Sequence, residues 1–282
     1  DQGRLLVEHA VAPGARITFA GTDIARGETV LRGGQLLTSR EIGVLAAIGH
    51  SSVSVVRRPS VAIISTGDEI IAPGEPMTHG GVYDSNAAIL AAAVEELGGQ
   101  PHVLGCFRDD LEELSRAVTE ALQHDVVVLS GGTSKGAGDL YYRVVSQLPP
   151  PGIVAHGVAL KPGKPICLAV TQGKPVVILP GFPTSAIFTF HEFVAPVIRC
   201  LAGRPAERRD TKPARLAVKV NSEIGRTEYL LVGLVEIDPD NLAAYPMGKG
   251  SGSVTTFSRA DGFVTIGRHD EILEAGTVVN VT

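Results

Sequence analysis

The sequence predicts an α/β protein: a three-layer αβα domain with a mostly parallel sheet, followed by a small β-barrel or sandwich. Apolar runs alternate with helical segments between residues 59 and 205, as in sheets that carry helices on both faces. From residue 206, apolar and polar residues alternate between Gly, Pro and Asp breaks, which is typical of antiparallel strands. Residues 1–58 are rich in glycine and predict a partial N-terminal β-rich and helical region. The expected domains are therefore 1–58, 59–205 and 206–282.

The N-terminal region is expected to hold two short strands and one helix. The apolar runs Arg4–Val7 and Arg16–Phe19 suggest the strands. Thr38 and Glu41 have the spacing of a capping box, in which each residue satisfies a backbone N–H near the helix start. The helix is expected to stop at Gly49.

The central region begins with Val61–Ile64, a continuous apolar run typical of a strand buried on both faces. Further strands are expected at 103–104, 126–129 and 176–179, and helices over 84–97, 110–123, 139–148 and 183–201. Pro183 suits the first turn of the last helix, where its missing N–H costs nothing, and Pro196 predicts a kink. No helical period is visible after residue 206.

Composition excludes several classes of protein. The net charge is −5, and no cluster of Lys and Arg suits a nucleic-acid surface. No apolar run approaches the roughly 18 residues of a membrane span. The first residues lack the features of a signal peptide. The cysteines, Cys106, Cys167 and Cys200, are odd in number and far apart, so we expect no disulfide framework and a cytoplasmic location.

Candidate site residues follow the predicted strands, because ligands of doubly wound sheets bind beyond the carboxyl ends of the strands. The first loop is Ser65–Glu69, with Thr66, Gly67 and the adjacent carboxylates Asp68 and Glu69. Such carboxylates can hold Mg²⁺ or transfer protons, although a solvated turn is the simpler alternative. Asp109 follows the next strand and, unlike Asp110, is not needed as a helix cap.

The second loop, Ser130–Asp139, contains Gly131, Gly132 and Ser134 before a helix. Small residues that expose backbone N–H groups at a helix start form an anion cradle. The loop fits neither a Walker A nor a G-x-G-x-x-G motif, and the alternatives are a turn without function and Asp139 as a helix cap.

The third loop combines two prolines with hydroxyl groups at a helix start and includes Pro180, Gly181, Pro183 and Ser185. Lys161 and Lys164 precede it on a Pro/Gly segment that suits a phosphate or another oxyanion, with surface lysines as the alternative. From the residues alone we expect a phosphorylated ligand and a divalent metal.

These loops together resemble a known family. The segments Ser65–Glu69, Arg108–Asp110, Ser130–Gly136, Lys161–Pro165 and Pro180–Ala186 occur in the order and context of the molybdopterin-binding domain of the molybdopterin molybdenumtransferase family. The likeness runs from the Gly27–Glu28 region through the expected barrel. The N-terminal part of the family, which in the family's dimer contributes to the partner's cleft, is missing. We therefore expect a fragment that binds the pterin nucleotide without the full catalytic equipment.

The resemblance implies that adenylylated molybdopterin and molybdate are the substrates, that Mg²⁺ is required, and that AMP is released as molybdenum is inserted. It implies catalytic and metal-binding roles for Glu69, Asp109 and Asp139. It further implies a ligand-binding role for Arg226 and Ser251 from the barrel, together with Thr66, Gly67, Asp68, Gly131, Gly132, Ser134, Lys161, Lys164, Pro180, Gly181, Pro183 and Ser185. A homodimer is implied, and an adenylyltransferase partner is left open.

The sequence departs from the family's usual pattern at a few positions. Gly157 stands where many members have a basic residue, with His156 beside it as an open substitute. Leu231 lies near the place of a second arginine, and Phe182 and Thr184 replace the commoner Asn and Val. The resemblance leaves open which contacts to the anion remain.

Two other functions fit the same domains. One is the preceding adenylyltransferase step, although the flanking regions 1–58 and 206–282 favour molybdenum insertion. The other is a non-catalytic pterin-binding or scaffold module, against which the acids Glu69, Asp109 and Asp139 argue. The sequence leaves molybdenum and tungsten as equal candidates for the metal.

Overall fold

A computed structural model of the chain describes residues 3, 9–131, 137–238, 241–248, 250 and 252–282, without the side chains of 137–139. The chain divides into two compact units, Asp1–Val55 and Val56–Thr282. The main sheet and the barrel both lie in the second unit. The domain bounds at 59 and 206 stay predictions.

The first unit contains the expected helix, α1 (Ser39–Ala47), and its capping box is present. The backbone N–H of Thr38 donates to Glu41 Oε2 at 2.8 Å, which confirms the prediction. The strand predicted at Arg16–Phe19 is wrong, because Ile17 and Phe19 are exposed and the segment forms turns and irregular structure. The other predicted strand, Arg4–Val7, lies outside the described residues.

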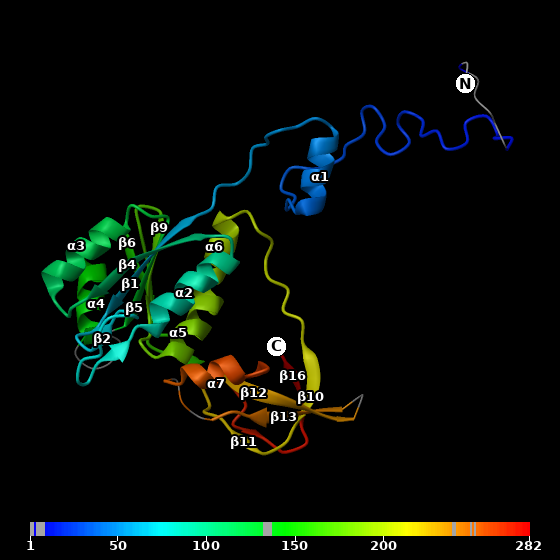
Figure 1. Cartoon of the computed structure of the whole chain (residues 1–282). Helices are drawn as coiled ribbons and strands as arrows, with labels where there is room; N and C mark the ends of the chain where they lie inside the picture. The colour runs from blue at the N-terminus through cyan, green and yellow to red at the C-terminus, as the bar shows by residue number, and fades with distance from the viewer. Residues whose placement is uncertain (1–2, 4–8, 132–136, 239–240, 249, 251) are drawn as a thin grey trace. The chain divides into compact units, whose positions relative to one another are not determined.

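The main sheet of the second unit is six-stranded, with β5 and β9 as its two middle strands (Figure 1). Four strands are parallel neighbours, as predicted: β4 (Gln100–Phe107), β1 (Ser60–Thr66), β5 (Val126–Gly131) and β9 (Lys174–Leu179). Two antiparallel strands, β8 (Cys167–Thr171) and β6 (Pro151–His156), complete the order β4-β1-β5-β9-β8-β6. These two strands were not predicted: β6 begins with Pro151 and Gly152, which are uncommon in strands, and the apolar residues Cys167–Val170 of β8 were not assigned to a strand.

Helices cover both faces of this sheet, which confirms the three layers (Figure 1). One face packs against α2 (Ser85–Glu96), α5 (Pro183–Thr189) and α6 (Ala195–Leu201), and the other against α3 (Leu111–Ala121) and α4 (Ala137–Ser146). The side chains of Asp84 and Asp110 cap α2 and α3 by accepting backbone N–H groups. The run Val61–Ile64 is fully buried, as predicted for a central strand.

The last predicted helix of this region is interrupted. Between α5 and α6 the chain forms one π-helical segment, η1 (Phe190–Val194). Pro196, in the first turn of α6, cannot donate to the carbonyl four residues earlier, and the wider turn before it accommodates this loss. The structure thus has a π-helical turn directly before Pro196, and the predicted kink itself stays a prediction.

The C-terminal region is a closed five-stranded barrel. Its strands are β10 (Lys212–Leu216), β16 (Val278–Val281), β14 (Gly262–Ile266), β12 (Thr227–Asp238) and β13 (Asn241–Pro246), closed by the pairing of β12 with β13. Although no helical period is visible in its sequence, this region also contains a helix. A short helix, α7 (Val254–Arg259), begins after Ser253, whose Oγ accepts from Thr256 N. Six residues are too few to show a helical period in the sequence.

Three short pairings complete the second unit. The two-residue strand β7 (Leu160–Lys161) pairs in parallel with β12 and so joins the barrel sheet. The pairs β2 (Ile70–Ile71) with β3 (Val82–Tyr83), and β11 (Val220–Asn221) with β15 (Ile272–Leu273), form two-stranded sheets. No helix in the described parts of the chain is long and apolar enough to cross a membrane. All three cysteines are free.

Candidate functional site

The carboxyl ends of β1, β5 and β9 lie side by side at one edge of the main sheet. The register places Thr66 beside Gly131 and Ser130 beside Leu179. The loops that follow these strands surround a pocket of about 350 Å³ together with the start of α2. The predicted site residues that line this first pocket are Thr66, Glu69, Gly131, Gly181 and Pro183. The ends of β1, β5 and β9 therefore contribute to one pocket, whereas Ser185 lines another pocket and the Asp139 side chain lies outside the described residues.

Glycines let the backbone of two of these loops approach closely. Gly131 has a φ of +125°, and a Cβ built there would lie 2.3 Å from the carbonyl oxygen of Thr66. Gly67 has a φ of +144°, and its Cβ would lie 2.9 Å from Glu69 Oε2. Side chains rarely adopt these conformations, so both glycines are required by the backbone. The Glu69 carboxylate folds back over Gly67 as a result.

Asn86, at the start of α2, ties two of the loops together. Its Nδ2 donates to Ser130 Oγ at 2.9 Å and to the Gly181 carbonyl at 2.8 Å. Its Oδ1 and the Ser65 Oγ are buried and have no hydrogen-bond partner among the described residues, and both residues line the first pocket. Buried polar atoms without partners are costly, which points to a polar ligand here. The sequence reasoning missed Asn86, although it follows the cap residue Asp84 by two positions.

Three carboxylates gather beside this pocket. The backbone N–H of Asp109 donates to Asp68 Oδ1 at 3.4 Å, and Asp109 Oδ1 is buried without a partner among the described residues. Burial, followed by the charges of Asp68 and Glu69, raises the pKa of Asp109. The excess of negative charge suits a divalent cation, which would relieve the repulsion. No three His, Cys, Asp or Glu side chains in the described ranges already form a metal-binding group.

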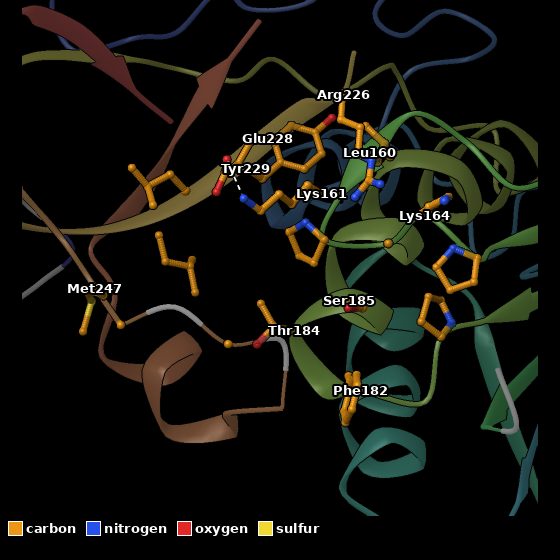
Figure 2. Close-up of a pocket in the computed structure, with 18 residues that line it drawn as sticks. Leu160, Lys161, Lys164, Phe182, Thr184, Ser185, Arg226, Glu228, Tyr229 and Met247 are labelled. Carbon is orange, nitrogen blue, oxygen red and sulfur yellow. Dashed lines mark ion pairs between the residues drawn. The ribbon is translucent and has the colours of Figure 1, made fainter. Parts of the chain in front are cut away.

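A second pocket, of about 580 Å³, lies between the α/β domain and the barrel (Figure 2). Among the residues that line it are the predicted site residues Lys161, Lys164, Pro180, Ser185 and Arg226. Phe182 lines both pockets, which are therefore adjacent. Leu231, one of the departures from the family pattern, contributes apolar surface to the second pocket.

Lys161 is held at the second pocket by the barrel. The pairing of β7 with β12 places Lys161 opposite Glu228, and Lys161 Nζ lies 3.2 Å from Glu228 Oε2 (Figure 2). Glu228 is buried and also accepts from Ser222 Oγ at 2.7 Å. A buried carboxylate is stable only when it is paired and hydrogen-bonded, as it is here. The sequence reasoning missed Glu228, since nothing near it in the chain marks it as functional.

The remaining predicted residues are not all brought into the pockets. Gly67, Asp68 and Asp109 lie beside the first pocket without lining it. Asp139 lies inside α4, not at its cap position, and its side chain is outside the described residues. His156 stacks on Tyr142, with ring centroids 4.7 Å apart, and lines neither pocket. Gly132, Ser134 and Ser251 fall outside the residues that the structure describes.

Two family patterns match the chain. Residues 62–200 match the "probable molybdopterin binding domain", and residues 213–282 match the "MoeA C-terminal region (domain IV)". The matched segments contain the main sheet and the barrel, respectively.

Relatives of known name or structure agree with these matches. Molybdopterin molybdenumtransferase 2 of Mycobacterium tuberculosis is 33% identical over 79% of this chain and 56% of its own length. Two crystal structures of molybdopterin biosynthesis MoeA proteins from Pyrococcus horikoshii align over 93% of this chain, with TM-scores of 0.79 and 0.72. They are 40% and 25% identical to it and are covered over 63% and 64% of their lengths. The chain thus spans little more than half of the curated relative.

Proposed function

The chain belongs to the MoeA family of molybdopterin molybdenumtransferases, and from this premise we propose that it binds adenylylated molybdopterin and molybdate. The proposed reaction inserts molybdenum into the pterin and releases AMP, which makes the protein an enzyme of molybdenum cofactor biosynthesis. The observation that carries the proposal is the adjacency of two chemically different pockets, one beside carboxylates and one lined by cations.

The cationic pocket suits the phosphate groups and the molybdate. Lys161, Lys164 and Arg226 all line it, and ammonium and guanidinium groups form charge-assisted hydrogen bonds to oxyanions. Release of AMP from a pyrophosphate requires stabilisation of the negative charge on the departing phosphate. Fixed cations near that phosphate would stabilise the transition state more than the ground state.

The carboxylate side suits Mg²⁺. Glu69 and Asp109 would hold the ion, together with Asp139, whose side chain is outside the described residues. Mg²⁺ takes oxygen ligands and would neutralise charge on the pyrophosphate. The partnerless Ser65 Oγ and Asn86 Oδ1 would meanwhile hydrogen-bond polar groups of the ligand and fix its orientation.

The barrel favours this reaction over the two alternatives. Arg226 and Glu228 come from the barrel and both line the second pocket, so the proposed site needs the barrel as well as the sheet domain. An adenylyltransferase that lacks the barrel would not have these side chains. A scaffold would gain nothing from the repulsion among Asp68, Glu69 and Asp109. The homodimer and the adenylyltransferase partner stay predictions.

Binding of adenylylated molybdopterin to the 282-residue chain, measured by calorimetry with and without Mg²⁺, tests the proposal. Mg²⁺-dependent binding is the expected result, and no binding in either condition would contradict it. Formation of adenylylated molybdopterin from ATP and molybdopterin would identify the adenylyltransferase instead. Efficient molybdenum insertion by the chain alone would reject the narrower expectation that it is a catalytically incomplete fragment.

The substitution Asp109→Asn is expected to raise the stability of the fold slightly and to weaken metal-dependent ligand binding. The charged form of Asp109 is disfavoured by burial and by Asp68 and Glu69, so removing the charge should slightly raise the melting temperature near neutral pH. The same change should weaken Mg²⁺-dependent ligand binding by at least about tenfold. Calorimetry and thermal unfolding measure the two effects. A variant that keeps wild-type Mg²⁺ dependence would remove Asp109 from the proposed ligands.

A further inference from the structure

Two carboxylates compete for the cations of the second pocket. Lys161 Nζ lies 3.2 Å from Glu228 Oε2 and 3.6 Å from Glu223 Oε1. The other oxygen of Glu223 lies 3.1 Å from Arg226 NH1. The Glu223 carboxylate therefore bridges Lys161 and Arg226, two of the three cationic side chains that the proposed function assigns to oxyanions.

The two glutamates differ in how firmly they are held. The side chain of Glu228 is 10% exposed and is also fixed by Ser222 Oγ, whereas that of Glu223 is 54% exposed. Glu223 lies in the loop between β11 and β12, whose backbone is anchored by Ser222 N to Glu271 O and by Gly225 N to Arg268 O. The loop is thus fixed while the Glu223 side chain can swing into solvent.

We propose that Glu223 is a displaceable carboxylate that occupies the oxyanion position between Lys161 and Arg226 until a tetrahedral oxyanion replaces it. A carboxylate presents two oxygens to neighbouring cations, as an edge of molybdate or of a phosphate does. Exposed ion pairs contribute little stability, so exchange of Glu223 for a bound oxyanion costs little. Glu228 stays with Lys161 throughout and keeps its ammonium group at the pocket. This inference rests on the proposed function for its ligand class.

The displaced carboxylate makes the site selective. To bind between Lys161 and Arg226, an anion must displace the tethered Glu223 carboxylate. Dianions such as molybdate or the phosphate of AMP carry more charge than monoanions and therefore have an advantage. Without Glu223 the two cations would also bind small monoanions of the solvent, such as chloride. Glu223 is therefore a specificity-determining residue and not a ligand of the substrate.

The test is the substitution Glu223→Gln in the full 282-residue chain. Titration calorimetry at low ionic strength, with sodium molybdate and AMP in separate arms, should show about threefold to tenfold tighter binding, because two exposed ion pairs no longer have to be broken. Chloride should compete with molybdate more strongly in this variant than in the wild type. The two arms show whether molybdate or the nucleotide phosphate displaces Glu223.

Glu274→Gln is the matched control for net charge. Glu274 is exposed and pairs with Lys219 at 3.2 Å on the barrel, and neither residue lines the second pocket. The substitution Glu274→Gln changes the chain's charge by the same amount as Glu223→Gln and should leave the affinities for molybdate and AMP unchanged. In an Arg226→Gln background, the gain in affinity from Glu223→Gln should fall below about twofold, because one of the two cations that Glu223 bridges is already absent.

Three results of these titrations would contradict the proposed role of Glu223. Equal affinities of the wild type and Glu223→Gln, or an equal gain in Glu274→Gln, would overturn it. So would a failure of both molybdate and AMP to bind any variant. Failure of the proposed function is a separate result, because it is the absence of Mg²⁺-dependent binding of adenylylated molybdopterin, whatever residue stands at position 223.

Discussion

Gly131→Ala is expected to abolish ligand binding in the first pocket and to lower the free energy of unfolding by about 2–4 kcal/mol. The added Cβ would lie 2.3 Å from the Thr66 carbonyl oxygen, which is backbone and cannot turn aside. Thr66 and Gly131 are partners in the ladder between β1 and β5, so these two strands must separate at their carboxyl ends. Urea unfolding and calorimetry with adenylylated molybdopterin measure the two effects.

Gly105→Ala is the control that distinguishes the effect of the close contact at Gly131 from the effect of its unusual backbone angle. Gly105 has a φ of +122°, close to that of Gly131, but a Cβ there meets nothing within 4 Å. It lies on β4, the other neighbour of β1, away from the first pocket. This control should lose about 1 kcal/mol through backbone strain alone and keep ligand binding. Equal losses in both variants would show that the contact with Thr66 is unimportant.

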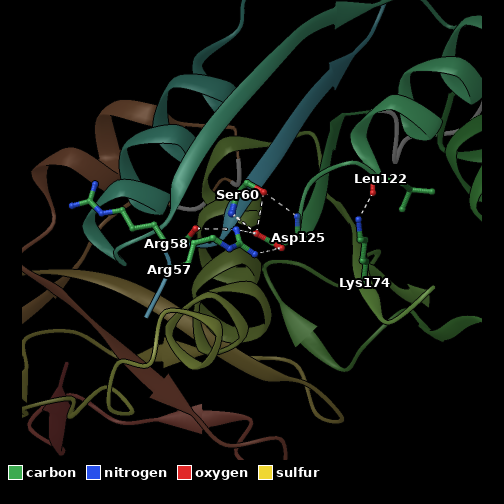
Figure 3. Close-up of polar contacts among 6 residues, drawn as sticks. All are labelled: Arg57, Arg58, Ser60, Leu122, Asp125 and Lys174. Atoms are coloured by element: carbon green, nitrogen blue, oxygen red, sulfur yellow. Dashed lines mark hydrogen bonds and ion pairs between the residues drawn. The ribbon is translucent and has the colours of Figure 1, made fainter. Parts of the chain in front are cut away.

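Asp125→Ala is expected to lower the free energy of unfolding by about 2–3 kcal/mol, because it leaves partly buried donors without a partner. Asp125 precedes β5, and its Oδ2 accepts from the backbone N–H of Ser60 at 2.7 Å and from Ser60 Oγ at 3.0 Å (Figure 3). Arg57 also donates to both carboxylate oxygens at 2.8 Å. These contacts fasten the start of β1 to the start of β5.

Arg57→Ala is the control for the ion pair. The Arg57 side chain is 73% exposed, so solvent screens the pair and its loss should cost less than about 1 kcal/mol. Urea unfolding at neutral pH measures both variants. A loss in Arg57→Ala as large as that in Asp125→Ala would show that the ion pair, and not the hydrogen bonds to Ser60, fastens the two strands.

The stability that Asp125 contributes should disappear in acid. The hydrogen bond from Arg57, then those from Ser60, outweigh burial and lower the pKa of Asp125 below its ordinary value. A carboxyl group with a lowered folded pKa contributes stability that is complete above the unfolded pKa and is lost as pH falls through the folded pKa. The difference in unfolding free energy between the wild type and Asp125→Asn should therefore be constant above about pH 5 and shrink below about pH 4. A difference independent of pH would contradict this assignment.

The elements that the sequence predicted correctly depend on neighbours along the chain. The cap residues Thr38, Asp84 and Asp110 act on backbone groups two or three residues away. The buried run Val61–Ile64 marks a central strand by its composition alone. The family resemblance likewise came from short loops whose order is visible in the sequence. The edge strand β6 was missed because it is only partly buried and begins with Pro151 and Gly152, and β8 was missed although Cys167–Val170 is an apolar run.

By itself the sequence determined the three-layer domain, the barrel and the loops that surround the first pocket, because helix caps, apolar runs and glycine-rich turns act over a few residues. Only the tertiary structure decided which side chains meet there. Asn86 reaches Ser130 and Gly181 across 44 and 95 residues, and Glu228 meets Lys161 only because β7 pairs with β12. Such contacts leave no local signature, since they arise when segments distant in the chain pack into one core. The division into two pockets, and the carboxylate between Lys161 and Arg226, follow from that packing.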